Sequence, residues 1–329
     1  MKKTKLDYIN IFLVVILGLL VILNFAVRFI NKEQDKMLWN AEIHSSAEQN
    51  SSSENLNSVK IVEAVFYNNF NHSTSGIDSE SDWVTNAKSE NSVHFKIWEK
   101  ELLPDSLSLK YFSIDERKFY LLTTPLPYKK MKDLVKGKEN TPVLILEIRP
   151  KGKVLLKMIQ SEEEKTEPQF VEEFISKETT GNLDMLVYEV SLGEKYNRYE
   201  GIENITDYSD LLQNQFKWSV QIEKQEQAVL TSIYAYSFIE NRIEISEDND
   251  VAVARSIPKI FYIYWKNKKE YNIQYELSPV EVLNAFRKLN QTNTSDPITL
   301  RFKVYKKAYI QCEISKNGIV IPLKDLYPE

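Results

Sequence analysis

The chain has 329 residues, with 42 lysines and arginines against 47 aspartates and glutamates, and a formal net charge of −5. Acids and bases are interspersed, which argues against nucleic-acid binding because that function usually needs a clustered basic face. The single cysteine, Cys312, excludes an intramolecular disulfide and a lipid-bearing cysteine near the N-terminus. Its place in an alternating run predicts a buried core thiol.

The N-terminal apolar segment is the first predicted element. Residues 8–30 read YINIFLVVILGLLVILNFAVRFI, long enough as a helix to cross a hydrocarbon core of ~30 Å. A cleaved signal peptide is the alternative, but the segment lacks an Ala-x-Ala-like site, so an uncleaved signal-anchor is preferred. The lysines of the tail at residues 1–7 favour a cytoplasmic tail. We therefore expect contact with the lipid bilayer through residues 8–30, in a bacterial inner membrane, with the C-terminal body in the periplasm.

Two kinds of sequence follow the apolar segment. Residues 31–58 are polar and serine-rich, as in SSAEQNSSSE at 45–54, which predicts a disordered tether. From Val59 onward, short runs alternate apolar and polar residues, the pattern typical of strands. We expect helices after Pro127 and at Ser278-Pro279, because proline suits the first helical position. Further segments are predicted as helix (168–177 and 207–212) and as strand (185–190).

The order of these elements occurs twice. Pro104 and Pro258 stand at equivalent places, an offset of about 154 residues. The same offset sets Leu144 on Ile298, Leu146 on Leu300 and Leu156 on Ile310. A period this long suggests two similar domains, since solenoid repeats are shorter. The boundaries that we predict are 59–212 for the first unit and 213–329 for the second.

The predicted fold class is therefore α+β. It consists of two related, mainly antiparallel β units, each with a short helix, and one N-terminal transmembrane helix. Apart from the span and its tether, some 270 residues are enough for one large or two ordinary domains.

One stretch resembles a known bacterial family. The residues that carry the resemblance are Leu103-Pro104, the strand from Ser106 to Ser113, the acidic turn Asp115-Glu116, the strand Lys118-Phe119-Tyr120, then Leu126-Pro127 and the Pro150-Lys151-Gly152 hairpin. In these motifs the chain resembles the family catalogued as domain of unknown function 2931, mainly over 93–160 and more loosely over 213–315. Many members look like secreted lipoproteins, which implies a body tethered to a membrane. The family brings no accepted activity, so the resemblance assigns no functional residue.

The residues that usually carry chemistry show no catalytic pattern. Asp115 and Glu116 are paired carboxylates, but they lie at a predicted hairpin tip, where turn formation explains them. The histidines, His44, His72 and His94, have no ligand spacing, and Cys312 has no histidine partner nearby in the sequence. We predict no metal and no cofactor, and the sequence identifies no catalytic residues.

A non-enzymatic envelope protein that binds another protein is the preferred functional hypothesis, and a toxin-neutralising immunity protein is one version of it. The expected contact is Tyr262, Tyr264 and Trp265, taken to share one strand face. The alternative is that these side chains belong to the core. A hydrolase of envelope polymers is a rival function, which predicts a cleft with convergent carboxylates. A glycan-binding module is the second rival, and it predicts exposed coplanar aromatic rings.

Overall fold

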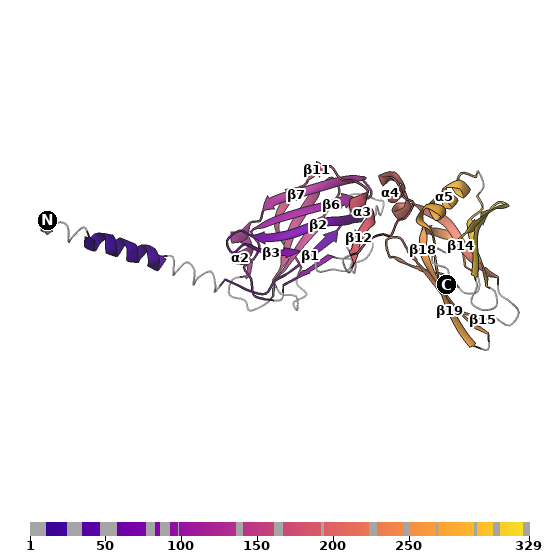
Figure 1. The fold of residues 1–329 in the computed structure, drawn as a ribbon, viewed down its shortest axis with the longest axis horizontal. Coiled ribbons are helices and arrows are strands. Elements are labelled where there is room, and N and C mark those ends of the chain that lie inside the picture. Colours follow the sequence, from indigo (N-terminus) through magenta and orange to yellow (C-terminus); the bar gives the residue numbers. More distant parts are fainter. Residues whose placement is uncertain are drawn as a thin grey trace. The chain divides into compact units, whose positions relative to one another are not determined.

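The computed structural model divides the chain into two compact units. Unit 1 comprises Met1–Tyr111 and Tyr120–Glu178, and unit 2 comprises Phe112–Phe119 and Thr179–Glu329. Figure 1 follows the chain through both in colour. The structure describes residues 11–24, 35–46, 58–76, 83–85, 93–97, 99–135, 141–160, 167–191, 194–223, 229–246, 250–267, 269–292, 295–304 and 310–324.

Unit 1 is built on two sheets. The first has the order β10 (Gln169–Ile175), β9 (Lys153–Ile159), β8 (Val143–Ile148), β1 (Asn40–Ser45), β5 (Val93–Lys96). The second has the order β11 (Lys177–Thr179), β7 (Lys118–Pro125), β6 (Ser106–Ser113), β2 (Ser58–Asn68), β3 (Ser73–Gly76), and β4 (Trp83–Thr85) also pairs with β2. In Figure 1 the strands β2, β6 and β7 lie side by side.

The two sheets of unit 1 pack face to face. Phe66 on β2 meets Trp39, which precedes β1, at 5.7 Å between ring centroids, and Phe95 on β5 at 5.1 Å. The helix α2 (Tyr128–Val135) adds Met131 and Val135 to the same core. These apolar side chains are removed from water together, which is the main favourable contribution to folding.

Unit 2 has the same architecture. Its first sheet has the order β22 (Ile319–Leu323), β21 (Ile310–Lys316), β20 (Ile298–Val304), β14 (Gln215–Glu223), β17 (Val253–Ser256). Its second has the order β19 (Lys269–Glu276), β18 (Pro258–Asn267), β15 (Val229–Ser237), β16 (Arg242–Glu244). Phe261 on β18 meets Phe302 on β20 at 4.7 Å between ring centroids, so here too a core fills the space between two sheets.

The helices of unit 2 follow from local sequence. α5 (Pro279–Asn290) has proline at its start and buries Val282, Phe286 and Leu289, a spacing that places apolar side chains on one helix face. The predicted helices at Pro127 and Ser278-Pro279 are thus confirmed as α2 and α5. Before β14 come α3 (Asp184–Val187), the hairpin β12 (Tyr188–Ser191) and β13 (Glu194–Asn197), and α4 (Ile205–Gln213).

The strand orders support the predicted internal duplication. The order β10-β9-β8-β1-β5 in unit 1 corresponds to β22-β21-β20-β14-β17 in unit 2, and β7-β6-β2-β3 corresponds to β19-β18-β15-β16. Even the parallel pair is repeated, as β1 with β8 and β14 with β20. A buried tryptophan also recurs: the indole N–H of Trp39 donates to Leu102 O and that of Trp218 to Ser256 O, each at 3.2 Å.

The alignment of one strand pair needs correction. Leu146 faces Leu156 across β8 and β9, whereas Leu300 faces Ile314 across β20 and β21. Leu156 therefore corresponds to Ile314, and the predicted match with Ile310 is wrong by four residues. The paired residues Leu300 and Ile314 are 14 positions apart, whereas Leu146 and Leu156 are 10 apart, and an alignment without gaps does not accommodate these four additional residues.

The predicted fold class is wrong in two respects. The described residues form mainly strands rather than an α+β mixture. None of their helices is long and apolar enough to cross a membrane, so the predicted transmembrane helix at 8–30 is not found. Within that segment, residues 11–24 are helical, which is about 21 Å of helix axis. The remainder, 8–10 and 25–30, lies outside the described residues.

Three further predictions differ from the structure. The expected tether at 31–58 contains β1, a strand inside the first sheet, while residues 47–57 lie outside the described part. The expected helix at 168–177 is the strand β10, because pairing with β9 overrides its helix-like spacing. The expected strand at 185–190 begins as α3. Apart from these three, the division of the chain into units falls between Glu178 and Thr179, whereas the predicted boundary lies between residues 212 and 213.

Candidate binding face of unit 2

Strand alternation places four tyrosines on the outer face of one sheet. On β15, Ile233 and Ala235 are buried in the core, which turns Tyr234 and Tyr236 outward. On β18, buried Phe261 and Ile263 likewise leave Tyr262 and Tyr264 on the outer face. We call these four tyrosines, together with Arg242, the tyrosine face.

The tyrosine rings pack against one another. Tyr234 stacks on Tyr262 with ring centroids 5.0 Å apart and planes 15° from parallel, and on Tyr264 at 6.1 Å and 23°. Tyr236 meets Tyr262 edge to face at 5.9 Å. Tyr234 is the direct partner of Tyr262 in the pairing of β15 with β18, so the strand register creates the stack. Such aromatic pairs contribute about 0.5–1.5 kcal/mol each beyond their buried area.

An arginine closes the stack at the β16 side. The guanidinium carbon of Arg242 lies 4.4 Å from the centroid of the Tyr234 ring, a cation–π contact. Its Nε is 2.8 Å from Oε1 of Glu244, two residues along the same short strand. From β16 to β18, the order across the sheet is therefore the Arg242 cation, the Tyr234 ring and the Tyr262 ring.

The β19 side of the same face is polar. Gln274 pairs with Tyr262, and Asn272 pairs with Tyr264, and both side chains are exposed. Glu276 and Glu270 stand at the two ends, opposite Ile260 and Lys266. The sheet thus presents aromatic rings bordered by amides and carboxylates.

Tyr234 and Tyr262 are neutral hydrogen-bonding groups at physiological pH. The hydroxyls of Tyr234 and Tyr264 are 3.4 Å apart, and this hydrogen bond raises the pKa of Tyr234 to about 12. Partial burial raises the pKa of Tyr262 as well. Hydroxyls held protonated act as donors and acceptors toward a ligand but are unsuited to act as general bases.

Trp265, the third residue predicted for this contact, belongs to the core. Its side chain is buried on the opposite face of β18 and stacks on Tyr271 with ring centroids 5.5 Å apart. Residues 262 and 264 are two positions apart on the strand, so their side chains share a face. Residue 265 follows 264 directly and points to the opposite face, so the expectation of one common face was wrong for Trp265. Tyr234, Tyr236 and Arg242 were missed, although Tyr234-Ala235-Tyr236 shows the same two-residue spacing as the β18 pair.

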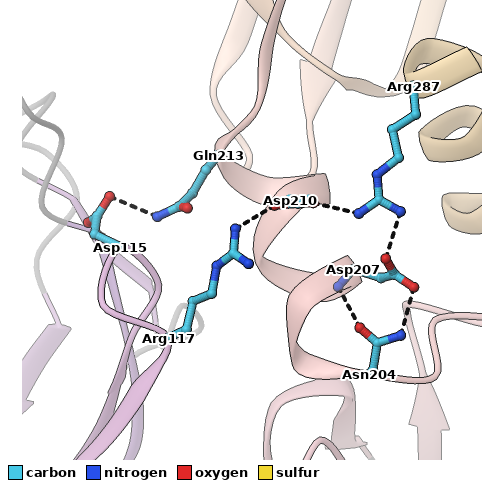
Figure 2. A network of polar contacts seen from close by, with 7 residues as sticks. All are labelled: Asp115, Arg117, Asn204, Asp207, Asp210, Gln213 and Arg287. Atoms are coloured by element: carbon cyan, nitrogen blue, oxygen red, sulfur yellow. Dashed lines mark hydrogen bonds and ion pairs between the residues drawn. The ribbon is translucent and has the colours of Figure 1, made fainter. Parts of the chain in front are cut away.

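A second polar cluster surrounds α4 (Figure 2). Asp210 accepts hydrogen bonds from Arg117 at 2.6 Å and from Arg287 at 2.5 Å. Arg287 also donates to Asp207 at 2.6 Å, and Asn204 caps the helix by accepting from the Asp207 N–H at 2.8 Å. These groups belong to unit 2, which includes the turn from Ile114 to Arg117.

This cluster stabilises structure rather than providing acid–base chemistry. The hydrogen bond from Arg287 lowers the pKa of Asp207, so that carboxylate stays ionised. Asp115, one of the two adjacent carboxylates at positions 115 and 116, accepts a hydrogen bond from the side-chain amide of Gln213 at 2.7 Å. Asp115 and Glu116 are in the turn predicted for them, within the segment 114–117.

Two of the histidines converge in unit 1, which their sequence positions did not indicate. His44 Nε2 is 2.7 Å from one oxygen of Glu42, and His94 Nδ1 is 3.6 Å from the other. The pairing of β1 with β5 places His94 opposite Glu42. Even so, the described residues include no group of three His, Cys, Asp or Glu side chains that is arranged to hold a metal ion. Cys312 is buried on β21, as predicted.

Comparisons with known proteins do not add to this description. No protein-family model, curated protein or solved structure matches the chain. The resemblance to domain of unknown function 2931 and the expected place in a bacterial envelope therefore stay predictions from sequence motifs.

Proposed function

We propose that this chain is a non-enzymatic protein-binding module whose contact surface is the tyrosine face of unit 2. One observation carries the proposal: four tyrosines and an arginine pack into a single array on the outside of a sheet. Tyrosine and arginine are enriched among the residues that dominate protein–protein binding energy. Core packing would explain such side chains if they lay on the inner face of the sheet, but these five lie on its outer face.

The array is ordered before any partner arrives. Each ring is held by its neighbours, and Arg242 is held by Tyr234 and Glu244 together. Side chains already fixed in one conformation lose little entropy on binding, and this raises affinity for a given contact area. Tyrosine has few rotatable bonds, which lowers that cost further.

A hydrolase receives no support from the carboxylates. General acid–base catalysis uses a pair whose pKa values are pushed apart. Among the described residues, every carboxylate with a clear pKa shift is shifted downward. Hydrogen bonds from partner side chains lower the pKa of Glu42, Asp207 and Glu313, and such bonds outweigh burial at Glu147 to bring its pKa to about 2. Carboxylates held ionised in this way are unsuited to act as general acids.

The ring geometry also favours a protein ligand over a glycan. A glycan-binding module was expected to show exposed coplanar aromatic rings. Here Tyr234 and Tyr262 stack face to face, and the remaining face of Tyr234 is covered by Arg242. The surface presented to solvent is therefore a mixture of hydroxyls, ring edges and polar groups, the composition typical of protein-recognition surfaces.

Site-specific photo-crosslinking in native cells tests the proposal. Gln274, exposed beside Tyr262, is replaced by p-benzoylphenylalanine, and Ser108, the residue of unit 1 that corresponds to Tyr262, serves as the control. We expect a discrete protein adduct at 274 that disappears when Tyr234 and Tyr262 are changed to alanine, and no adduct at 108. Equal adducts at both positions, or none at 274, would contradict a binding role for this face.

A further inference from the structure

We infer that an extended segment of the partner pairs with the edge strand β19 and continues the sheet that carries the tyrosine face. This inference rests on the proposed function and specifies how the partner binds. Its support comes from the other sheet edges of the molecule, from the backbone groups of β19 and from the side chains along that strand.

In the described parts of the chain, β19 is the one long sheet edge without protection. An open edge can pair with another chain, so proteins usually shorten, bend or cover such strands. β22 contains Pro322, and β10 has a register shift between Phe170 and Glu172 as well as a hydrogen bond from Lys130 to Val171 O. The other edge strands have three or four residues. β19 has eight residues, no proline and an unbroken register with β18.

Unit 1 shows the corresponding edge occupied. There β7 corresponds to β19, and β11 pairs with β7 on the side away from β6. In unit 2, no strand formed by the described residues lies on the side of β19 away from β18. A short extended segment thus completes this edge in one unit, and the same edge of the other unit can accept a segment from a partner.

The backbone of β19 dictates the conformation of that segment. The N–H of Leu277, which directly follows the strand, donates to Lys259 O at 2.8 Å. Because backbone groups alternate sides along a strand, the odd-numbered residues of β19 bond to β18, and the N–H and C=O groups of Asn272 and Gln274 point to the open side. None of the described residues bonds to these four groups. Only an extended chain presents donors and acceptors at the matching spacing.

The side chains of β19 form two rows that the segment would meet. Tyr271 and Ile273 belong to the core-facing row but are only half-buried. Apolar side chains at alternate positions of an added strand would complete their burial. Asn272 and Gln274 belong to the outer row and are exposed beside the tyrosine face. The added strand would therefore place polar side chains next to that face.

The charge at one end of β19 favours a basic partner over a second copy of the chain. The side chain of Glu270 is 83% exposed, and its ion pair with Lys266 is 3.8 Å long, so this pair contributes little. A lysine or arginine opposite Glu270 would be a favourable cross-strand pair. In an antiparallel pairing with a second copy, the residue opposite Glu270 would be Gln274 or Glu276, and neither is a cation. We therefore expect a segment that alternates apolar and polar residues and carries a base.

Panning of a phage-displayed dodecapeptide library against the full-length chain tests the inference. Asn272→Pro removes the N–H on the open side, a change that an edge strand tolerates, whereas Asn272→Ala alters the side chain and keeps the N–H. Peptides selected on the wild type should alternate apolar and polar residues and include lysine or arginine. They should bind Asn272→Ala within about twofold of the wild type and Asn272→Pro about tenfold more weakly. Circular dichroism and urea unfolding establish that both variants remain folded.

Amide hydrogen exchange of the wild-type chain gives a second readout that needs no variant. A bound synthetic peptide should slow exchange at Asn272 and Gln274 by about tenfold or more and leave Ile273, whose N–H bonds to β18, unchanged. Peptides that require Tyr262 but bind Asn272→Pro as they bind the wild type, or that protect neither amide, would overturn this inference and leave the proposed function standing. Failure to select any peptide, or self-association of the chain that Asn272→Pro abolishes, would overturn it too. The crosslinking at position 274 judges the proposed function independently.

Discussion

The two units share a strand order but differ at the outward positions of one strand pair. Setting Pro104 on Pro258 places buried Leu107 and Leu109 of β6 on buried Phe261 and Ile263 of β18. The intervening outward residues are Ser108 and Lys110 in unit 1 but Tyr262 and Tyr264 in unit 2. Inward positions have kept their apolar character because the core requires it. The outward positions are free of that requirement, and this is where a function specific to unit 2 is expected.

An ion pair on the other sheet differs in another way. Glu147 on β8 is paired with Arg149 at 2.6 Å and with Lys157, whereas the corresponding residue on β20 is a cation, Arg301, paired with Glu313 at 3.0 Å. The sign of the charge has been exchanged while a charged pair has been kept. What the two units share at this site is thus a pairing requirement rather than a residue type.

The largest expected effect concerns the repeated tryptophan. Trp39→Ala and Trp218→Ala each empty a buried site and should each lower the free energy of unfolding by about 3–5 kcal/mol. Urea unfolding followed by circular dichroism measures both. The matched controls, Trp39→Phe and Trp218→Phe, keep a ring but leave a carbonyl without its indole donor, and should cost about 1–2 kcal/mol. A cost below about 1 kcal/mol for either alanine variant would show that the two tryptophans are not equivalent.

The next effect is acid sensitivity, which should be stronger at Glu147. Burial alone would raise its pKa, but hydrogen bonds from Lys157, Ser46 and Arg149 outweigh burial and lower it to about 2. The folded-state pKa is thus below the unfolded value near 4.5. Its contribution, about 3 kcal/mol, is complete above pH ~4.5 and is lost as pH falls from there toward 2. Glu313, whose pKa is lowered by hydrogen bonds from Lys303 and Arg301, should respond in the same direction.

Urea midpoints between pH 7 and pH 3 measure this contrast. Glu147→Gln should lower stability at pH 7 and flatten its decline in acid, because the titrating group is gone. Glu313→Gln should do the same to a smaller degree. An unchanged pH dependence in Glu147→Gln would mean that the acid sensitivity arises elsewhere, and a larger effect at Glu313 would reverse the comparison between the units.

How far the sequence predicts this molecule depends on how local each feature is. The alternation of apolar and polar residues predicted the strand β18 and the shared face of Tyr262 and Tyr264. The proline positions predicted the helices α2 and α5. The partners of those tyrosines were not predictable in the same way, because Tyr234 joins them only through the pairing of β15 with β18. Similarly, β1 is a short segment whose strand conformation depends on parallel pairing with β8, about one hundred residues away. Periodicity carries no information about such pairings.

The smallest expected effect tests whether the tyrosine face is separable from the fold. Tyr262→Ser with Tyr264→Lys gives unit 2 the outward residues of unit 1 and removes three ring contacts. Because these contacts lie on an outer face, each should contribute near the lower end of its range, so the loss should be about 1.5–2 kcal/mol. The reciprocal exchange, Ser108→Tyr with Lys110→Tyr, should change stability by less than about 1 kcal/mol, since solvent-facing positions tolerate substitution. Urea unfolding of the two double variants measures both. A loss in the first variant as large as that of Trp218→Ala would place these tyrosines among the residues that hold the fold together. A small loss would instead leave Tyr262 and Tyr264 as residues that the fold does not require, which is what the proposed binding role predicts.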